Sequence, residues 1–134
     1  RGVGAFNRNQ RLRVSGRRAL EDAVVGTGIP HLGRPGHESF REQLAQITGE
    51  VGGVRRMGAA ALDLCYVAAG RFDAYWELGL EPWDVAAGIV IVQEAGGFIT
   101  DLKGRRNPLS GESVLAGNAH IHGALGKRFA GTAA

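Results

Sequence analysis

The spacing of hydrophobic positions changes several times along the chain, and each spacing predicts a different element. Strands are predicted where short apolar runs, or alternating apolar and polar residues, lie between turn residues. Helices are predicted where apolar residues recur every three or four positions. The strand segments are residues 20–28, 51–56, 71–78, 98–102 and 113–116, and the helical segments are residues 37–48, 58–69, 82–95 and 119–129. Ahead of them, a hairpin is predicted from residues 2–6 and 11–15, which flank a turn-prone cluster at residues 7–10.

The segment 71–78 shows the clearest alternation of apolar and polar side chains. Successive side chains of a strand point to opposite faces of the sheet. One face is expected to carry Phe72, Ala74, Trp76 and Leu78, and the other Asp73, Tyr75 and Glu77.

The segment 82–95 contains the run Ile89-Val90-Ile91-Val92, which on its own would indicate a strand. The segment is too long for a strand of the usual ~4–8 residues, so a helix is predicted instead. Pro82 suits the first turn of a helix, and Gly96-Gly97 suits its end. Because the helix is apolar almost all round, we expect it to be buried between layers, with Ala86-Ala87-Gly88 admitting another backbone closely.

The alternation of strands and helices indicates one domain of α/β architecture. The chain has 134 residues, of which 44% are hydrophobic and 22% charged, as in an ordinary globular domain. No apolar run approaches the ~18 residues that a membrane helix needs. The net charge is only +3 with no dense basic stripe, so binding to nucleic acid is not expected. A single cysteine, Cys65, fits a reducing compartment, and we expect a cytoplasmic protein.

The start of the chain suggests that it is the later part of a longer protein. Residue 1 is Arg, and the only methionine is Met57, deep inside the sequence. Glycine accounts for 22 residues, which lie mostly between apolar runs and indicate many tight connections.

Two acidic residues near the end of one predicted strand are the best candidates for chemistry. Glu77 closes the strand segment 71–78, and Asp84 lies in the first turn of the next helix. Ligands of α/β sheets collect beyond the carboxyl ends of strands, where two acids could bind a hard cation or the hydroxyl groups of a polyol. The alternative is that Asp84 only complements the helix dipole, which is worth about 0.3–1 kcal/mol.

Several motifs resemble those of the inositol monophosphatase family. The most specific resemblance is to its C-terminal signature, in Trp83 to Gly88 followed by Glu94 to Gly97. Supporting matches are Arg55 to Leu64, Gly4 to Asn7 and Leu115 to Asn118. The resemblance runs through nearly the whole chain but covers only the second half of the family. It implies that residues 1–134 form the C-terminal α/β layer of an αβαβα sandwich of the inositol monophosphatase and sugar phosphatase type.

The resemblance also implies roles for particular residues. Asp84 matches a ligand of catalytic Mg²⁺, and Glu77 matches the acid that accepts hydrogen bonds from substrate hydroxyl groups. Gly58, Ala59 and Ala60 match a substrate-contacting turn, where a helix N-terminus would favour an anion. Relatives often carry a hydroxyl residue at position 59, so Ala59 leaves a backbone contact there but removes a side-chain contact.

The other metal ligands of the family are an upstream glutamate and the aspartates of an Asp-Pro-x-Asp-Gly-Thr motif, which does not occur here. We therefore expect this chain to be inactive alone and the complete protein to need its N-terminal half. The activity implied is magnesium-dependent hydrolysis of inositol monophosphate or a similar small phosphorylated polyol. The resemblance also implies a homodimer. The alternatives are a sister phosphatase for nucleotide or sugar bisphosphates, or a non-catalytic interaction or oligomerisation module whose helix around Ile89–Val92 is covered by another chain.

Other polar residues are weaker candidates. Cys65 lies among apolar residues and is expected to pack in the core, because no activating base is apparent. Asp63 is expected to be an exposed helix residue rather than a polar contact near the site. Arg55-Arg56 could attract a phosphate group or could simply flank a strand edge.

Overall fold

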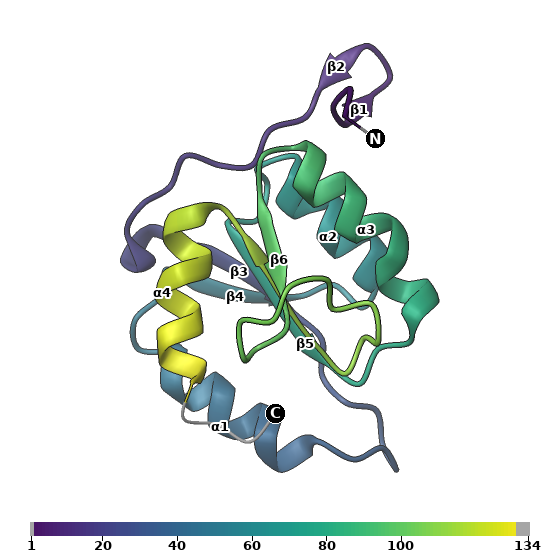
Figure 1. Ribbon diagram of the computed structural model, residues 1–134. Helices are drawn as coiled ribbons and strands as arrows, with labels where there is room; N and C mark the ends of the chain where they lie inside the picture. The colour runs from purple at the N-terminus through teal and green to yellow at the C-terminus, as the bar shows by residue number, and fades with distance from the viewer. Residues whose placement is uncertain (1, 131–134) are drawn as a thin grey trace.

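A five-stranded sheet in the order β4-β3-β5-β7-β6 forms the centre of the molecule (Figure 1). The computed structural model describes residues 2–130, so Arg1 and residues 131–134 lie outside the description. Strands β3, β4 and β5 are parallel, whereas β7 runs antiparallel to both β5 and β6. The strands are β3 (Val24–Thr27), β4 (Gly53–Arg56), β5 (Ala74–Leu78), β6 (Phe98–Thr100) and β7 (Ser113–Gly117). The predicted α/β architecture is confirmed.

Helices cover both faces of the sheet and make three layers (Figure 1). On one face, α2 (Ala60–Ala68) and α3 (Pro82–Glu94) enclose a core that includes Tyr75 of β5. On the other face, α1 (His37–Ile47) and α4 (Ala119–Phe129) enclose a second core that includes Trp76. No helix within residues 2–130 is long and apolar enough to cross a membrane.

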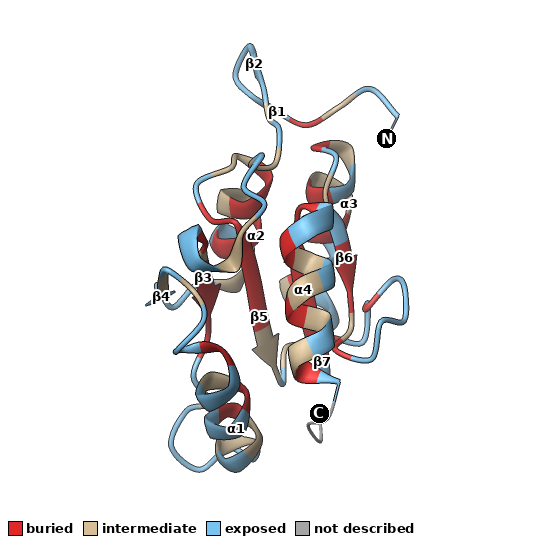
Figure 2. Ribbon diagram, turned by 90° about the vertical axis from the view of Figure 1, so that its left-hand side faces the viewer, coloured by how far each residue is buried: buried red, intermediate tan, exposed pale blue. Residues whose placement is uncertain are grey.

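The alternation predicted for segment 71–78 is confirmed within β5 but fails before it. Ala74 and Trp76 face the core under α1 and α4, and Tyr75 faces the core under α2 and α3. Phe72 packs in the same core as Tyr75, not with Trp76 as expected. The physical reason is that the strand begins only at Ala74, so residue 72 lies in a bend to which strand alternation does not apply. Figure 2 shows β5 buried at its start and half-buried at its end.

The N-terminal hairpin is confirmed but is shorter than predicted. It consists of β1 (Phe6–Asn7) and β2 (Gln10–Arg11), paired antiparallel, and projects from the sheet (Figure 1). Residues 12–15 form no strand, although the backbone N–H of Val14 donates to the carbonyl of Ala95 at 3.0 Å. The predicted strand 20–28 is also shorter, because a 3-10 turn, η1 (Leu20–Asp22), precedes β3.

Helix α3 forms over the predicted segment but is not buried all round. Val85, Ile89 and Val92 are buried, whereas Trp83 is 77% exposed, so the helix has an open outer face. Gly88 packs closely on α2, but against a side chain rather than the backbone that was expected, because a Cβ there would lie 2.9 Å from the Cβ of Leu64.

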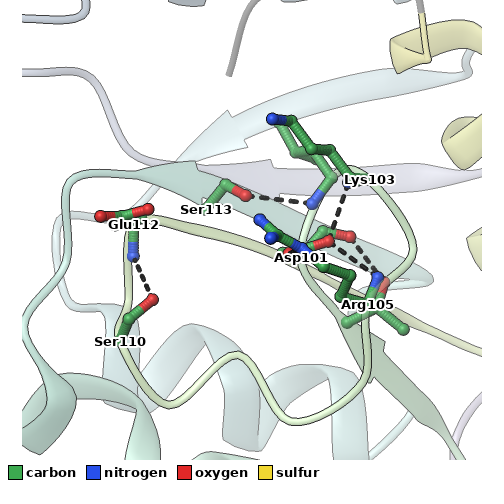
Figure 3. Close-up of polar contacts among 8 residues, drawn as sticks. Asp101, Lys103, Arg105, Ser110, Glu112 and Ser113 are labelled. Carbon is green, nitrogen blue, oxygen red and sulfur yellow. Dashed lines mark hydrogen bonds and ion pairs between the residues drawn. The ribbon is translucent and has the colours of Figure 1, made fainter.

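The polar loop predicted between β6 and β7 is held mainly by Asp101 (Figure 3). Its carboxylate accepts hydrogen bonds from the backbone N–H groups of Lys103 and Arg105 at 2.9 and 2.8 Å, and from the Arg105 guanidinium at 2.7 Å. The backbone N–H of Glu112 also donates to the hydroxyl of Ser110 at 3.4 Å. The loop connects the two strands farthest from β4 in the sheet, and its residues do not line the pocket described below.

Candidate functional site

A pocket of about 520 Å³ lies where the parallel strands β3, β4 and β5 end. Three chain segments meet around it: the loop after β3, the turn between β4 and α2, and the connection from β5 into α3. Its lining residues lie within 28–35, 56–60 and 77–84. This is the position that parallel α/β sheets use for ligands, because the carboxyl ends of the strands and the starts of the helices converge there.

Glu77 enters the pocket from the end of β5 and is half-buried. One of its carboxylate oxygens accepts a hydrogen bond from the hydroxyl group of Tyr75, two residues earlier on the same face of the strand. Burial raises the pKa of Glu77 above its ordinary value, although the hydrogen bond from Tyr75 opposes the shift, and the charge of Asp84 adds to it. Glu77 is therefore a pocket-lining carboxyl group with one oxygen anchored by Tyr75.

Asp84 lines the same pocket from the first turn of α3. Its Oδ2 accepts a hydrogen bond from the backbone N–H of Glu81 at 2.9 Å, and the two residues form a capping box. Such a cap is worth about 0.5–2 kcal/mol. Asp84 thus has a capping role at the start of α3 that the helix-dipole alternative did not include, and one carboxylate oxygen of Asp84 has no part in this hydrogen bond.

The turn formed by Gly58, Ala59 and Ala60 lines the pocket opposite these acids. Gly58 has a φ of +89°, a conformation that favours glycine, and Ala59 is the N-cap of α2. No side chain among residues 2–130 caps this helix, so its first backbone N–H groups are available to an anion at the pocket. The sequence-predicted substrate residues are thus brought around one cavity together with Glu77 and Asp84.

The exposure predicted for Asp63 is wrong. It was expected on the exposed face of α2, but it is only 1% exposed, and both carboxylate oxygens lack a hydrogen-bond partner among residues 2–130. Burial, together with the nearby charge of Glu77, raises the pKa of Asp63 to about 6, against the effect of Arg56. The burial of Asp63 could have been predicted from helical spacing. Position 63 lies three residues after Ala60 and four before Val67, on the buried side of the helix.

Replacing Asp63 with asparagine is expected to make the unfolding free energy of the chain less dependent on pH. A raised pKa means that the folded state favours the protonated carboxyl group, so stability falls as the pH rises from the ordinary value of 3.8 to about 6. The amide does not titrate, and it removes this loss. Urea unfolding on both sides of this pH range tests the prediction, with the exposed Asp22→Asn variant as the control. Equal pH dependence for Asp63→Asn and the unmodified chain would contradict it.

Basic side chains also border the pocket, and among them only Arg56 was a candidate from the sequence. Arg56 lines the cavity, whereas the guanidinium of Arg55 donates to the carbonyl of Val54 at 3.0 Å and lies outside the lining. His31 and Arg34 reach the pocket from the loop after β3. The signal for them was their position directly after a buried strand that ends at the same edge as Glu77.

The acids of the pocket could supply part of a magnesium site. Among residues 2–130 no group of three or more histidine, cysteine, aspartate or glutamate side chains is arranged to hold a metal ion. Magnesium commonly takes one or two protein carboxylates and completes its octahedral shell with water and phosphate oxygens. The Asp84 carboxylate fits as one such ligand, provided that the remaining protein ligands come from outside the described residues.

Comparisons with known proteins show which family this chain resembles. The model of the inositol monophosphatase family matches residues 1–133. An inositol-1-monophosphatase of Rhizobium meliloti is 55% identical over 125 residues, which are 93% of this chain and 47% of that protein. A Nus factor SuhB of Pseudomonas aeruginosa is 46% identical over 127 residues, again 93% of this chain and 47% of the relative.

A solved structure matches the fold closely. The crystal structure of the extragenic suppressor protein suhB from Bartonella henselae superimposes with a TM-score of 0.91 at 51% identity, covering 96% of this chain and 49% of that one. The match confirms the predicted fold class. The chain spans about half the length of the relatives it matches.

Proposed function

The chain belongs to the inositol monophosphatase family, and we propose from this membership and the pocket geometry that the complete protein is a phosphomonoesterase. Its substrate is proposed to be inositol monophosphate or a similar small phosphorylated polyol, and its cofactor Mg²⁺. The observation that carries the proposal is the convergence of Glu77, Asp84 and the turn 58–60 on one cavity at the carboxyl ends of three parallel strands.

Each part of the pocket has a chemical role in this proposal. The free backbone N–H groups at the start of α2 bind oxygen atoms of the substrate phosphate, because a helix N-terminus attracts anions. Glu77 accepts hydrogen bonds from hydroxyl groups of the polyol and thereby orients the ester. Asp84 supplies one ligand to magnesium, with further ligands from the N-terminal half of the protein. The chemistry that bound magnesium supplies is activation of water for in-line attack on phosphorus.

Phosphate release by the complete protein is the direct test of this proposal. We expect turnover of inositol monophosphate that needs magnesium and is lost with a chelator. This 134-residue chain alone is expected to release no phosphate, since the other metal ligands that the family resemblance implies are absent from it. A panel with nucleotide and sugar bisphosphates separates the sister phosphatases. Magnesium-dependent turnover by the purified 134-residue chain would contradict the assignment of the remaining ligands to another part of the protein.

A non-catalytic interaction module is the second candidate. The surface that a partner could cover differs from the one expected. Ile89 and Val92 are already buried by the chain itself, whereas the outer face of α3 around Trp83 is exposed. Mixing the chain with the N-terminal half discriminates between the two candidates. Restored turnover supports the phosphatase, and stable association without turnover supports the interaction role. The homodimer implied by the family resemblance stays a prediction.

A further inference from the structure

Gly28 directly follows β3 and lies beside Glu77 of the neighbouring strand β5. Strands β3 and β5 are parallel neighbours in which Gly26 aligns with Tyr75 and Thr27 with Trp76, so the next position brings residue 28 next to Glu77. Gly28 is buried and lines the pocket. Its φ is not among the positive φ values of the chain, so its backbone conformation does not call for glycine. The reason for glycine must therefore be space.

That space is filled by the carboxyl group of Glu77. A Cβ atom on residue 28 would overlap this carboxyl group, including both of its oxygens. The strands cannot readily separate to relieve the overlap, because the hydroxyl of Thr27 donates to the carbonyl of Trp76 at 2.9 Å and ties β3 to β5 at this point. A side chain at position 28 would therefore displace the flexible end of Glu77 rather than the backbone.

Tyr75 holds the same carboxyl group from another direction. Its side chain is fully buried in the core between the sheet and helices α2 and α3, and its hydroxyl donates to Oε1 of Glu77. Burial raises the pKa of Tyr75, so the hydroxyl stays protonated and remains a donor. Glu77 is thus restricted by a fixed donor on one side and a backbone without a side chain on the other.

We propose that Gly28 and Tyr75 are positioning residues that aim the Glu77 carboxylate at substrate hydroxyl groups and thereby set selectivity for polyol phosphates over phosphate esters without hydroxyl groups. The inference rests on the proposed function for its substrate class. The orientation of Glu77 itself rests on the contacts of Gly28 and Tyr75 alone.

The test compares Gly28→Ala and Tyr75→Phe variants of the complete protein on two substrates, inositol monophosphate and phenyl phosphate. For both variants, kcat/KM for inositol monophosphate is expected to fall about tenfold or more, mainly through KM, which corresponds to a misdirected charge-assisted hydrogen bond. Hydrolysis of phenyl phosphate should stay nearly unchanged, because it offers no hydroxyl group to Glu77. The control is Tyr66→Phe, since Tyr66 packs against Phe72 and Arg71 and does not line this pocket.

An equal fall on both substrates, or an unchanged ratio in both variants, would overturn the proposal. Tyr75→Phe removes only an oxygen atom and keeps the test decisive if Gly28→Ala does not fold. The pKa of Glu77, measured by carboxyl ¹³C NMR without substrate, should rise in Tyr75→Phe and not in Tyr66→Phe, because a donor to the charged form is lost. If the unmodified protein hydrolyses neither substrate, the proposed function fails, and a Glu77 pKa that is the same in Tyr75→Phe would separately overturn the positioning.

Discussion

Replacing Asp84 with asparagine in the complete protein is expected to lower magnesium-dependent phosphate release by more than about a hundredfold, since even residues that only support metal ligands cost about 10–100-fold. Asparagine has nearly the shape of aspartate, and its amide oxygen can still accept the hydrogen bond from the backbone N–H of Glu81. The substitution therefore keeps the cap of α3 and removes the negative charge. Magnesium prefers anionic oxygen ligands, so the loss should appear first as a weaker affinity for the metal.

The helix-dipole alternative for Asp84 predicts a different outcome for the same variant. If the carboxylate only complements the dipole of α3, the change costs about 0.3–1 kcal/mol of stability and leaves turnover nearly intact. Glu38→Gln is a matched control, because Glu38 also lies in the first turn of a helix, α1, and does not line the pocket. Magnesium titrations of phosphate release, together with thermal unfolding of both variants, distinguish the explanations. Turnover of Asp84→Asn within a few-fold of the unmodified protein would contradict the ligand role.

The elements of the fold were largely predictable from local signals. Helix α3 was predicted correctly despite the strand-like run at Ile89–Val92, because Pro82 and the length of the segment outweigh the β-branched residues. The sheet order β4-β3-β5-β7-β6 was not predicted, since strand neighbours depend on contacts between distant parts of the chain. The error at Phe72 has a local cause, because the two-residue period holds only from the first strand residue onward.

The candidate site was predictable from residue positions alone at the end of β5 and the start of α3. Glu77 and Asp84 were expected at one crevice, and the structure brings both to the same pocket. That the loop residue His31 reaches the pocket was not predicted, because the path of a loop is not encoded by periodicity. Asp63 was misplaced because an ionisable residue is rarely buried without a partner, so its type outweighed its helical position. The contacts of Gly28 and Tyr75 with the Glu77 carboxyl group were also not predicted, because a glycine required for space cannot be distinguished from any other glycine in a sequence.

The core beneath α1 and α4 depends on Trp76, which is fully buried in the middle of β5. Its ring stacks on Phe40 of α1 with a centroid distance of 6.0 Å and lies 5.4 Å from the ring of Phe129 in α4. The indole N–H donates to the side-chain oxygen of Gln43 at 2.9 Å. One side chain thus joins the sheet to both helices of this layer and gives the buried amide oxygen of Gln43 its hydrogen bond.

Trp76→Ala is expected to lower the free energy of unfolding by about 3–5 kcal/mol, because it leaves a large cavity in the core. Loss of the indole donor adds to this, since Gln43 is fully buried and its amide nitrogen already lacks a partner among the described residues. Trp83→Ala is the matched control, because Trp83 is 77% exposed and its loss should change stability by no more than about 0.5 kcal/mol. Denaturant unfolding followed by far-ultraviolet circular dichroism measures both variants. A loss below about 1 kcal/mol for Trp76→Ala, the average for any substitution, would mean that this layer does not hold β5, and Glu77 with it, in place.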